Sequence, residues 1–248
     1  MASARHCVPN PAWATEVLID IYDSIAGGDV PAAWLPRLDG MQRKGTTGVV
    51  AHVHEYGCGQ YGCVYPTLDP NIVLKVTADD TEAEFAAELS SLIERPVCVK
   101  YHLVIKAEGA QDPRGSDVYL LWRESADQVG KIVDVIDERH GIELGTHATI
   151  LLNTQHQLAQ NAYMAIYNHE DRSEILRMVA EWLESCEAMA RQTEVPELRE
   201  LGDGLVEVYR AERIFFGDIH YGNLGLVKRA DGEHWVITDP GHVAVINI

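Results

Sequence analysis

Residues 214–227 read Ile214-Phe-Phe-Gly-Asp-Ile-His-Tyr-Gly-Asn-Leu-Gly-Leu-Val227. The run is apolar at both ends, and its middle favours neither helix nor strand. The pattern predicts a loop between two strands, with Asp218 and Asn223 held in that loop. Residues 234–241 form another β-rich run, which ends in Asp239 before a Pro-Gly break. Oxygen-bearing side chains at neighbouring strand ends indicate a divalent cation, because Mg²⁺ prefers such ligands together with substrate phosphates.

The composition is that of a globular chain with an unusual charge. Hydrophobic residues make up 46% of the 248 residues and charged residues 23%, which is ordinary. The formal net charge of −18 means that nucleic acid and anionic membrane surfaces would repel the chain. No apolar run approaches the length of a membrane span, and the first residues lack the apolar core of a signal peptide. We therefore expect a cytoplasmic protein with no nucleic-acid or membrane partner.

The five cysteines are scattered and form neither a CxxC pair nor a zinc-binding spacing. Cys58 and Cys63 are close enough in sequence to approach one another in a turn. Thiols are usually reduced in the cytoplasm, so we expect these two to be free thiols and not a regulatory disulfide.

Residues 1–47 are predicted to form an N-terminal helical extension. Pro11 suits the first turn of a helix, and apolar residues recur at helical spacing after it. Gly27 and Gly28 end that helix, and Asp29 can cap a short second one. This extension is expected to pack against the part of the chain that follows.

A glycine-rich stretch, Gly57-Cys-Gly-Gln-Tyr-Gly62, lies between β-like runs. A dinucleotide-binding glycine motif would open a helix after its last glycine, whereas here Val64 and Tyr65 continue as a strand. The pattern favours a glycine flap between antiparallel strands, whose backbone N–H groups can cover phosphates. An ordinary glycine-rich hairpin is the alternative.

Lys75 stands inside an apolar β-like run over residues 72–76. Such a lysine either faces water at an edge or is a buried ammonium that needs a counter-charge. An acid-rich helix follows at once. Glu88 recurs at helical spacing with the apolar Phe85, so we assign it as the counter-charge, with Glu84 as the second candidate.

The rest of the chain changes from strand to helix patterns after residue 125. Residues 97–106 and 118–122 are predicted strands, and residues 150–167, 174–191 and 195–213 are predicted helices. The predicted organisation is therefore a sheet-bearing domain over residues 48–125 and a mainly helical domain over residues 126–248.

The order of these motifs resembles that of the protein-kinase-like superfamily, which includes aminoglycoside and choline phosphotransferases. The shared elements are a glycine flap, a strand lysine, a helix glutamate, an Asp-x-x-x-x-Asn loop and an Asp-x-Gly after a strand. The resemblance covers residues 48–245. It implies an α+β fold with a small antiparallel sheet lobe, a hinge over residues 120–125, and a mainly helical lobe truncated after the Asp-x-Gly motif.

The resemblance implies a role for each motif residue. Asp218 would accept or orient the acceptor hydroxyl, and Lys75, held by Glu88, would contact the α- and β-phosphates of ATP. Asn223 and Asp239 would bind Mg²⁺ or Mn²⁺. The residues expected around ATP come from the glycine loop and the hinge: Gly57, Gly59, Tyr61, Gly62, Val64, Lys75, Leu121, Trp122 and Glu124.

The chain also departs from the protein kinases. Phe216 replaces the usual His or Tyr, His220 stands where Ser/Thr kinases generally carry Lys, and Pro240 replaces the Phe of Asp-Phe-Gly. The string Gly-Asp-Ile-His-Tyr-Gly-Asn resembles Gly-Asp-Leu-His-Pro-Gly-Asn of small-molecule phosphotransferases. Because nine residues follow Asp239, we expect no activation segment.

These features favour an ATP-dependent phosphotransferase that acts on a hydroxyl of a small molecule or of a protein Ser/Thr. His220 favours the small-molecule acceptor. The alternative is a pseudokinase that holds a nucleotide and serves as a binding or regulatory module.

Overall fold

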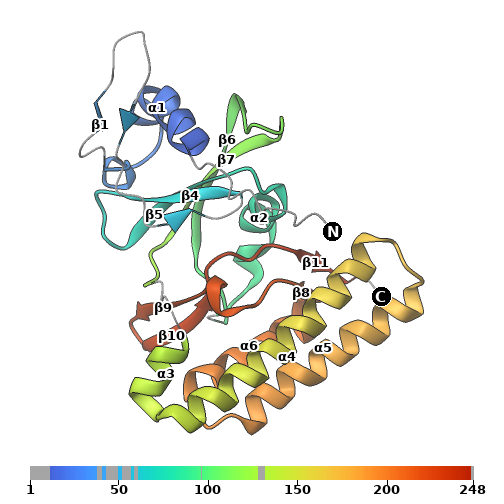
Figure 1. The fold of residues 1–248 in the computed structure, drawn as a ribbon. Helices are drawn as coiled ribbons and strands as arrows, with labels where there is room; N and C mark the ends of the chain where they lie inside the picture. Colours follow the sequence, from blue (N-terminus) through green and yellow to red (C-terminus); the bar gives the residue numbers. More distant parts are fainter. Residues whose placement is uncertain are drawn as a thin grey trace, which may run out of the picture. The chain divides into compact units, whose positions relative to one another are not determined.

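The structure is a computed structural model that describes residues 12–37, 41–42, 50–51, 57–58, 61–95, 97–127 and 132–246. The fold is α+β, with a small antiparallel sheet and several helices (Figure 1). The chain divides into two compact units. The first comprises Met1–Ala87 and Lys100–Ser125, and the second comprises Glu88–Val99 and Ala126–Ile248.

The first unit is built on a five-stranded sheet in the order β3-β4-β5-β7-β6. Its strands are β3 (Gly57–Cys58), β4 (Gly62–Pro66), β5 (Ile72–Thr77), β6 (Tyr101–Gln111) and β7 (Asp117–Glu124). All neighbouring strands are antiparallel. A separate pair, β1 (Met41–Gln42) and β2 (Val50–Ala51), precedes the sheet. Most of the strand predicted before the glycine loop, residues 49–56, lies outside the described residues.

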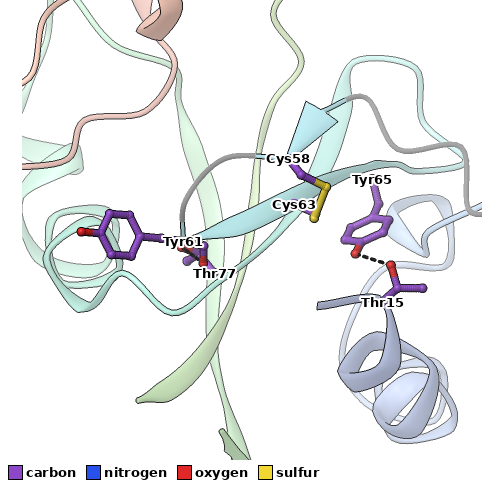
Figure 2. The surroundings of a disulfide bond; sticks show 6 residues. All are labelled: Thr15, Cys58, Tyr61, Cys63, Tyr65 and Thr77. Atoms are coloured by element: carbon purple, nitrogen blue, oxygen red, sulfur yellow. Dashed lines mark hydrogen bonds between the residues drawn. A yellow bond between two sulfur atoms is a disulfide. The ribbon is translucent and has the colours of Figure 1, made fainter. Parts of the chain in front are cut away.

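One face of this sheet packs against the N-terminal helix α1 (Ala12–Ala26), which is followed by the short 3₁₀ turn η1 (Ala32–Trp34). Thr15 of α1 and the hydroxyl of Tyr65 of β4 are 2.9 Å apart and hydrogen-bonded (Figure 2). Leu18 of α1 is fully buried in the same core. The predicted N-terminal helix is therefore present and completes the core of the first unit.

The opposite face of the sheet packs against α2 (Asp80–Glu84), which continues as the π-helical turn η2 (Phe85–Leu89). Ala83 and Ala86 are buried against Leu121 of β7. The Asp79 side chain caps α2 by accepting hydrogen bonds from the backbone N–H groups of Thr81 and Glu82.

Cys58 and Cys63 form a disulfide between β3 and β4 (Figure 2). The expectation of free thiols is therefore wrong for this pair. The physical reason is the strand register, which places Cys58 directly opposite Cys63. Gly62 is also required here, because a Cβ at this position would lie 2.0 Å from the carbonyl oxygen of Val76.

The second unit is mainly helical. Its helices are α3 (Ile132–His140), α4 (Ile142–Tyr167), α5 (Arg172–Gln192) and α6 (Pro196–Glu212), and α4, α5 and α6 lie side by side (Figure 1). The three predicted helices correspond to α4, α5 and α6, and α4 begins eight residues before the predicted start at residue 150. Pro196 occupies the first turn of α6, and Arg213 ends it in the left-handed region at φ 59°.

Short strand pairs complete the second unit. β8 (Ile214–Phe216) pairs with β11 (Val243–Val245), and β9 (Leu224–Arg229) pairs with β10 (Gly232–Ile237). Residues 214–227 therefore form the predicted strand, loop and strand. α6 packs against β8 and β10. Among the described residues, no helix has both the length and the apolar character needed to cross a membrane.

Residues 97–99 were predicted to begin a strand of the first sheet, and this prediction is wrong. They lie beside β10, where the Val99 N–H donates to the Ile237 oxygen at 3.1 Å and the Ile237 N–H donates to the Val97 oxygen at 2.9 Å. Val97, Cys98 and Val99 are all buried. Their apolar side chains require burial, and the backbone of β10 satisfies their hydrogen-bonding groups.

Candidate functional site

Asp218 lies two residues after the end of β8, and Gly217 between them fixes the path of the chain. The Gly217 N–H donates to the His242 carbonyl oxygen at 2.9 Å. A Cβ on Gly217 would lie 2.8 Å from that oxygen and 2.9 Å from the Cβ of Tyr163 on α4. Any side chain at this position would clash with both atoms, so the position requires glycine. The chain before Asp218 is therefore held between α4 and the segment that leads into β11.

Asp218 and Asn223 are hydrogen-bonded to each other. The Asn223 amide nitrogen Nδ2 donates to the Asp218 carbonyl oxygen and to its carboxylate Oδ2, both at 3.1 Å. Because the nitrogen faces Asp218, the side-chain oxygen Oδ1 of Asn223 is the atom left for a cation. The structure thus brings together the two residues that the loop pattern singled out.

Asp239 lies close in the fold to Asn223 because of the β9–β10 register. Leu224 pairs with Ile237, and the Thr238 N–H donates to the Asn223 carbonyl oxygen at 2.7 Å. Asn223 and Asp239 therefore sit at the same end of this hairpin. An amide oxygen and a carboxylate fit Mg²⁺, which commonly uses one or two carboxylates together with water and phosphate oxygens. Among the described residues, no cluster of three or more His, Cys, Asp or Glu side chains could hold a metal ion.

Gln160 of α4 also contacts Asp218. Its side-chain nitrogen Nε2 donates to the Asp218 Oδ1 at 3.1 Å and to the Gly217 carbonyl oxygen at 3.0 Å. The sequence analysis missed this residue. Gln160 is one of three glutamines in a 26-residue helix and belongs to no motif, so no sequence signal points to it.

Two histidines lie near the same carboxylate oxygen. The nearest ring nitrogens to Asp218 Oδ1 are His220 Nε2 at 3.6 Å and His156 Nδ1 at 3.9 Å, and the ring centroids are 5.2 Å apart. The His220 Nδ1 accepts a hydrogen bond from the Gly222 N–H at 3.0 Å, so the neutral ring carries its proton on Nε2. Burial, assisted by His220, lowers the pKa of His156 below its ordinary value of 6.5.

In the first unit, Lys75 forms a buried ion pair with Glu82. The Lys75 Nζ lies 2.6 Å from the Glu82 Oε2, and the two side chains are 6% and 0% exposed. The hydroxyl of Tyr101 donates to the other Glu82 oxygen at 2.9 Å. The assignment of Glu88 as the counter-charge is therefore wrong, and so is the second candidate, Glu84.

The reason for this correction is the shape of the helix. The assignment assumed regular α-helical spacing over residues 80–92, whereas the helix changes to a π-helical turn at Phe85. The buried residues of this helix are Glu82, Ala83, Phe85 and Ala86, whereas Glu84 and Glu88 are exposed. Glu82 stands three and four positions before Phe85 and Ala86, so it shares their buried face. The wider π turn that begins at Phe85 takes Glu88 off that face, and the sequence carries no plain signal for such a turn.

Val64, Lys75 and Leu121 form a row across three strands. Val64 of β4 is in register with Lys75 of β5, which is in register with Leu121 of β7. Directly opposite residues in an antiparallel sheet share a face, so these three predicted nucleotide-binding residues come together. All three are buried.

Most of the predicted hinge, residues 120–124, lies within β7, and the chain passes from the first unit to the second after Ser125. Leu121 and Trp122 lie inside β7, which pairs with β5 on one side and β6 on the other, so their backbone groups are engaged in the sheet. The indole Nε1 of Trp122 donates to the Trp34 carbonyl oxygen at 2.8 Å. The carboxylate of Glu124 accepts a hydrogen bond from the Lys100 N–H at 3.2 Å.

The glycine loop is described in part. Gly57 of β3 is in register with Val64, and Gly62 opens β4. The Tyr61 carbonyl oxygen accepts a hydrogen bond from the Ala78 N–H at 2.8 Å, which ties the end of the loop to the end of β5. Gly59, the remaining predicted residue of this loop, lies outside the described residues.

Comparisons with known proteins do not assign the chain to a family. No protein-family model matches it, and no curated protein matches it. The resemblance to protein-kinase-like enzymes therefore rests on the sequence motifs alone.

Proposed function

We propose that this protein is a metal-dependent phosphotransferase that moves the γ-phosphate of Mg-ATP to a hydroxyl acceptor. The observation that most supports the proposal is the hydrogen-bonded pair of Asp218 and Asn223, at the end of the β9–β10 hairpin after which Asp239 follows. Phosphoryl transfer requires a group that orients the acceptor hydroxyl and oxygen ligands that bind the metal. These three residues supply both kinds of group.

Each residue has a role in this proposal. Asp218 accepts or orients the hydroxyl proton of the acceptor, and Asn223 and Asp239 would hold Mg²⁺ or Mn²⁺. The metal, when bound, neutralises charge on the phosphates. Lys75, held by Glu82, pairs with phosphate oxygens of the nucleotide. A two-lobed protein-kinase-like arrangement of the two units is part of the proposal.

The acceptor is a small molecule or a protein Ser/Thr hydroxyl. His220, which takes the place of the lysine usual in Ser/Thr kinases, supports the small-molecule acceptor. Its Nδ1 accepts the Gly222 N–H, so the ring presents its Nε2 toward Asp218.

The test is Mg-ATP turnover with a panel of hydroxyl acceptors, compared between the wild type and Asp218→Asn. Loss of one preorganised catalytic group costs about 3 kcal/mol in the barrier, so we expect turnover to fall by roughly 100-fold or more. Asp203→Asn on the exposed face of α6 is the matched control and should leave turnover unchanged.

The outcomes separate the two functions considered. Equal turnover in the wild type and Asp218→Asn would refute the proposal for Asp218. A wild type that binds Mg-ATP but turns over no acceptor would instead support a nucleotide-binding module. Binding can be read independently as thermal stabilisation, which is worth about 2.7 kcal/mol at 100 times Kd.

A further inference from the structure

The orientation of the Asp218 carboxylate must be fixed by other groups, because Asp218 lies on a loop and its side chain is 25% exposed. The terminal torsion of an Asp side chain has a broad energy profile, so hydrogen bonds must fix the plane of its carboxylate. One oxygen, Oδ2, is held by Asn223. Three side chains approach the other oxygen, Oδ1: those of Gln160, His220 and His156.

Distances separate these three groups. A normal N–H···O hydrogen bond spans about 2.7–3.2 Å between heavy atoms. Gln160 Nε2 is within this range at 3.1 Å, whereas His220 Nε2 at 3.6 Å and His156 Nδ1 at 3.9 Å lie outside it. Among the described residues, Gln160 is therefore the side chain that holds Oδ1 by a normal hydrogen bond.

We propose that Gln160 is the positioning residue for Asp218 in phosphoryl transfer, an inference that rests on the proposed function. The two hydrogens of its Nε2 serve two acceptors, the Gly217 carbonyl oxygen and the Asp218 Oδ1. The amide therefore ties the carboxylate to the backbone of the residue before it. With Asn223 on Oδ2, each carboxylate oxygen has one amide donor and keeps a lone pair for the acceptor hydroxyl.

The place of Gln160 in α4 suits this role. Its neighbours Ala159 and Ala162 are fully buried, and α4 packs along α5. A side chain carried by a packed helix is held more precisely than one carried by a loop. Through its two hydrogen bonds, Gln160 thus restrains the loop that bears Asp218 against the packed helix α4.

The neighbouring histidines cannot substitute for this amide. Burial lowers the pKa of His156 below its ordinary value, which disfavours a positive charge beside Oδ1. The other titratable groups that face His156 are His220, His242 and Asp218 itself. The Nδ1 of His220 is engaged with Gly222, which keeps that ring bound to its own loop.

The experiment compares Gln160→Leu with Gln157→Leu. Both replace a glutamine of α4, but Gln157 is exposed and its Nε2 donates to Asn161 Oδ1. A misplacement of about 1 Å can cost on the order of 100-fold in rate, so we expect Gln160→Leu to lower kcat by about that factor. The Kd for Mg-ATP should stay within about twofold, because the group acts on the acceptor side. Gln157→Leu should match the wild type in both.

Gln160→Glu provides a second variant that keeps the side-chain shape. It removes both donors and places an acceptor against two oxygens, so its kcat should fall at least as far as that of Gln160→Leu. Circular dichroism at the assay temperature checks that each variant is folded. A loss of kcat with an equal loss of nucleotide affinity would indicate a general structural role and would overturn the inference.

The two proposals fail in different ways. If Asp218→Asn abolishes turnover and Gln160→Leu does not change kcat, the positioning role is wrong and the proposed function stands. If Asp218→Asn itself is fully active, the proposed function is wrong. The contact can also be read without turnover, from the side-chain NH₂ resonances of Gln160. We expect them to exchange more slowly than those of Gln157 and to shift in Asp218→Ala, and unshifted resonances would overturn the contact.

Discussion

The buried ion pair between Lys75 and Glu82 gives the first prediction. Removing one partner of such a pair leaves an uncompensated charge in the interior and costs about 3–5 kcal/mol. Glu82→Ala should therefore lower the free energy of unfolding by about this amount, whereas exposed Glu88→Ala should change it by less than about 0.5 kcal/mol. Denaturant unfolding measures both. If Glu88→Ala lowered the free energy of unfolding more than Glu82→Ala, Glu88 would be the counter-charge of Lys75 after all.

His234 gives a second prediction at this scale, on the pH dependence of stability. Its ring nitrogens lie 2.9 Å from Glu200 and 3.0 Å from Asp231, and the side chain is 8% exposed. Burial acts to lower the pKa of His234, but the two hydrogen-bonded carboxylates outweigh it and raise the pKa above its ordinary value of 6.5. The folded protein therefore holds this proton more tightly than the unfolded chain does.

The sign follows from this difference in proton affinity. The stabilisation by protonated His234 is fully present below pH 6.5 and is lost as the pH rises through the higher pKa of the folded state. We expect the stability difference between the wild type and His234→Gln to shrink from pH 5.5 to pH 8.5. Urea unfolding at several pH values measures this difference. A difference that grows with pH would contradict the raised pKa.

At the scale of the element, the β3–β4 hairpin gives a prediction about its disulfide. Closing a short loop in the unfolded chain stabilises the folded state by about 2 kcal/mol in the chain-entropy treatment. Reduction of wild-type protein by a dithiol should therefore lower its unfolding midpoint. The same treatment should leave Cys58→Ser unchanged, because that variant cannot close the loop. Reduced wild type with an unshifted midpoint, and with both thiols open to alkylation, would contradict the prediction.

Elements with a regular apolar period could be predicted from the sequence. The helices α5 and α6 bury side chains such as Trp182 and Leu205 at helical spacing, so their existence and approximate ends followed from that pattern. The loop after β8 was equally readable, because polar residues interrupt an apolar run on both sides. These features depend on neighbours in the chain.

The features that the sequence did not reveal depend on partners distant in the chain. The π turn at Phe85 takes Glu88 off the buried face of the helix, and no local rule predicts such a turn. β7 continues through the expected hinge because β5 and β6 pair with it there. Gln160 reaches Asp218 across 58 residues of chain, so only the packed fold brings them together.

At the scale of the whole molecule, the net charge of −18 opposes the binding of an anionic nucleotide. The overall field repels ATP, so a site for it must rely on local positive groups and bound metal. In the proposed function Lys75 is such a group, and its burial would protect its interactions from salt. The repulsion from the acidic surface acts over a longer distance and is screened efficiently.

This contrast predicts an unusual dependence of nucleotide affinity on salt. The screening length falls from about 30 Å at 0.01 M to about 8 Å at 0.15 M, so added KCl removes mainly the long-range repulsion. The Kd for Mg-ATP, measured by calorimetry at constant pH and MgCl₂, should therefore decrease severalfold between these salt concentrations. Adenosine, which carries no phosphate, is the matched control and should bind equally at both. An affinity for Mg-ATP that weakens with salt would mean that exposed cations, and not buried Lys75 with metal, hold the phosphates.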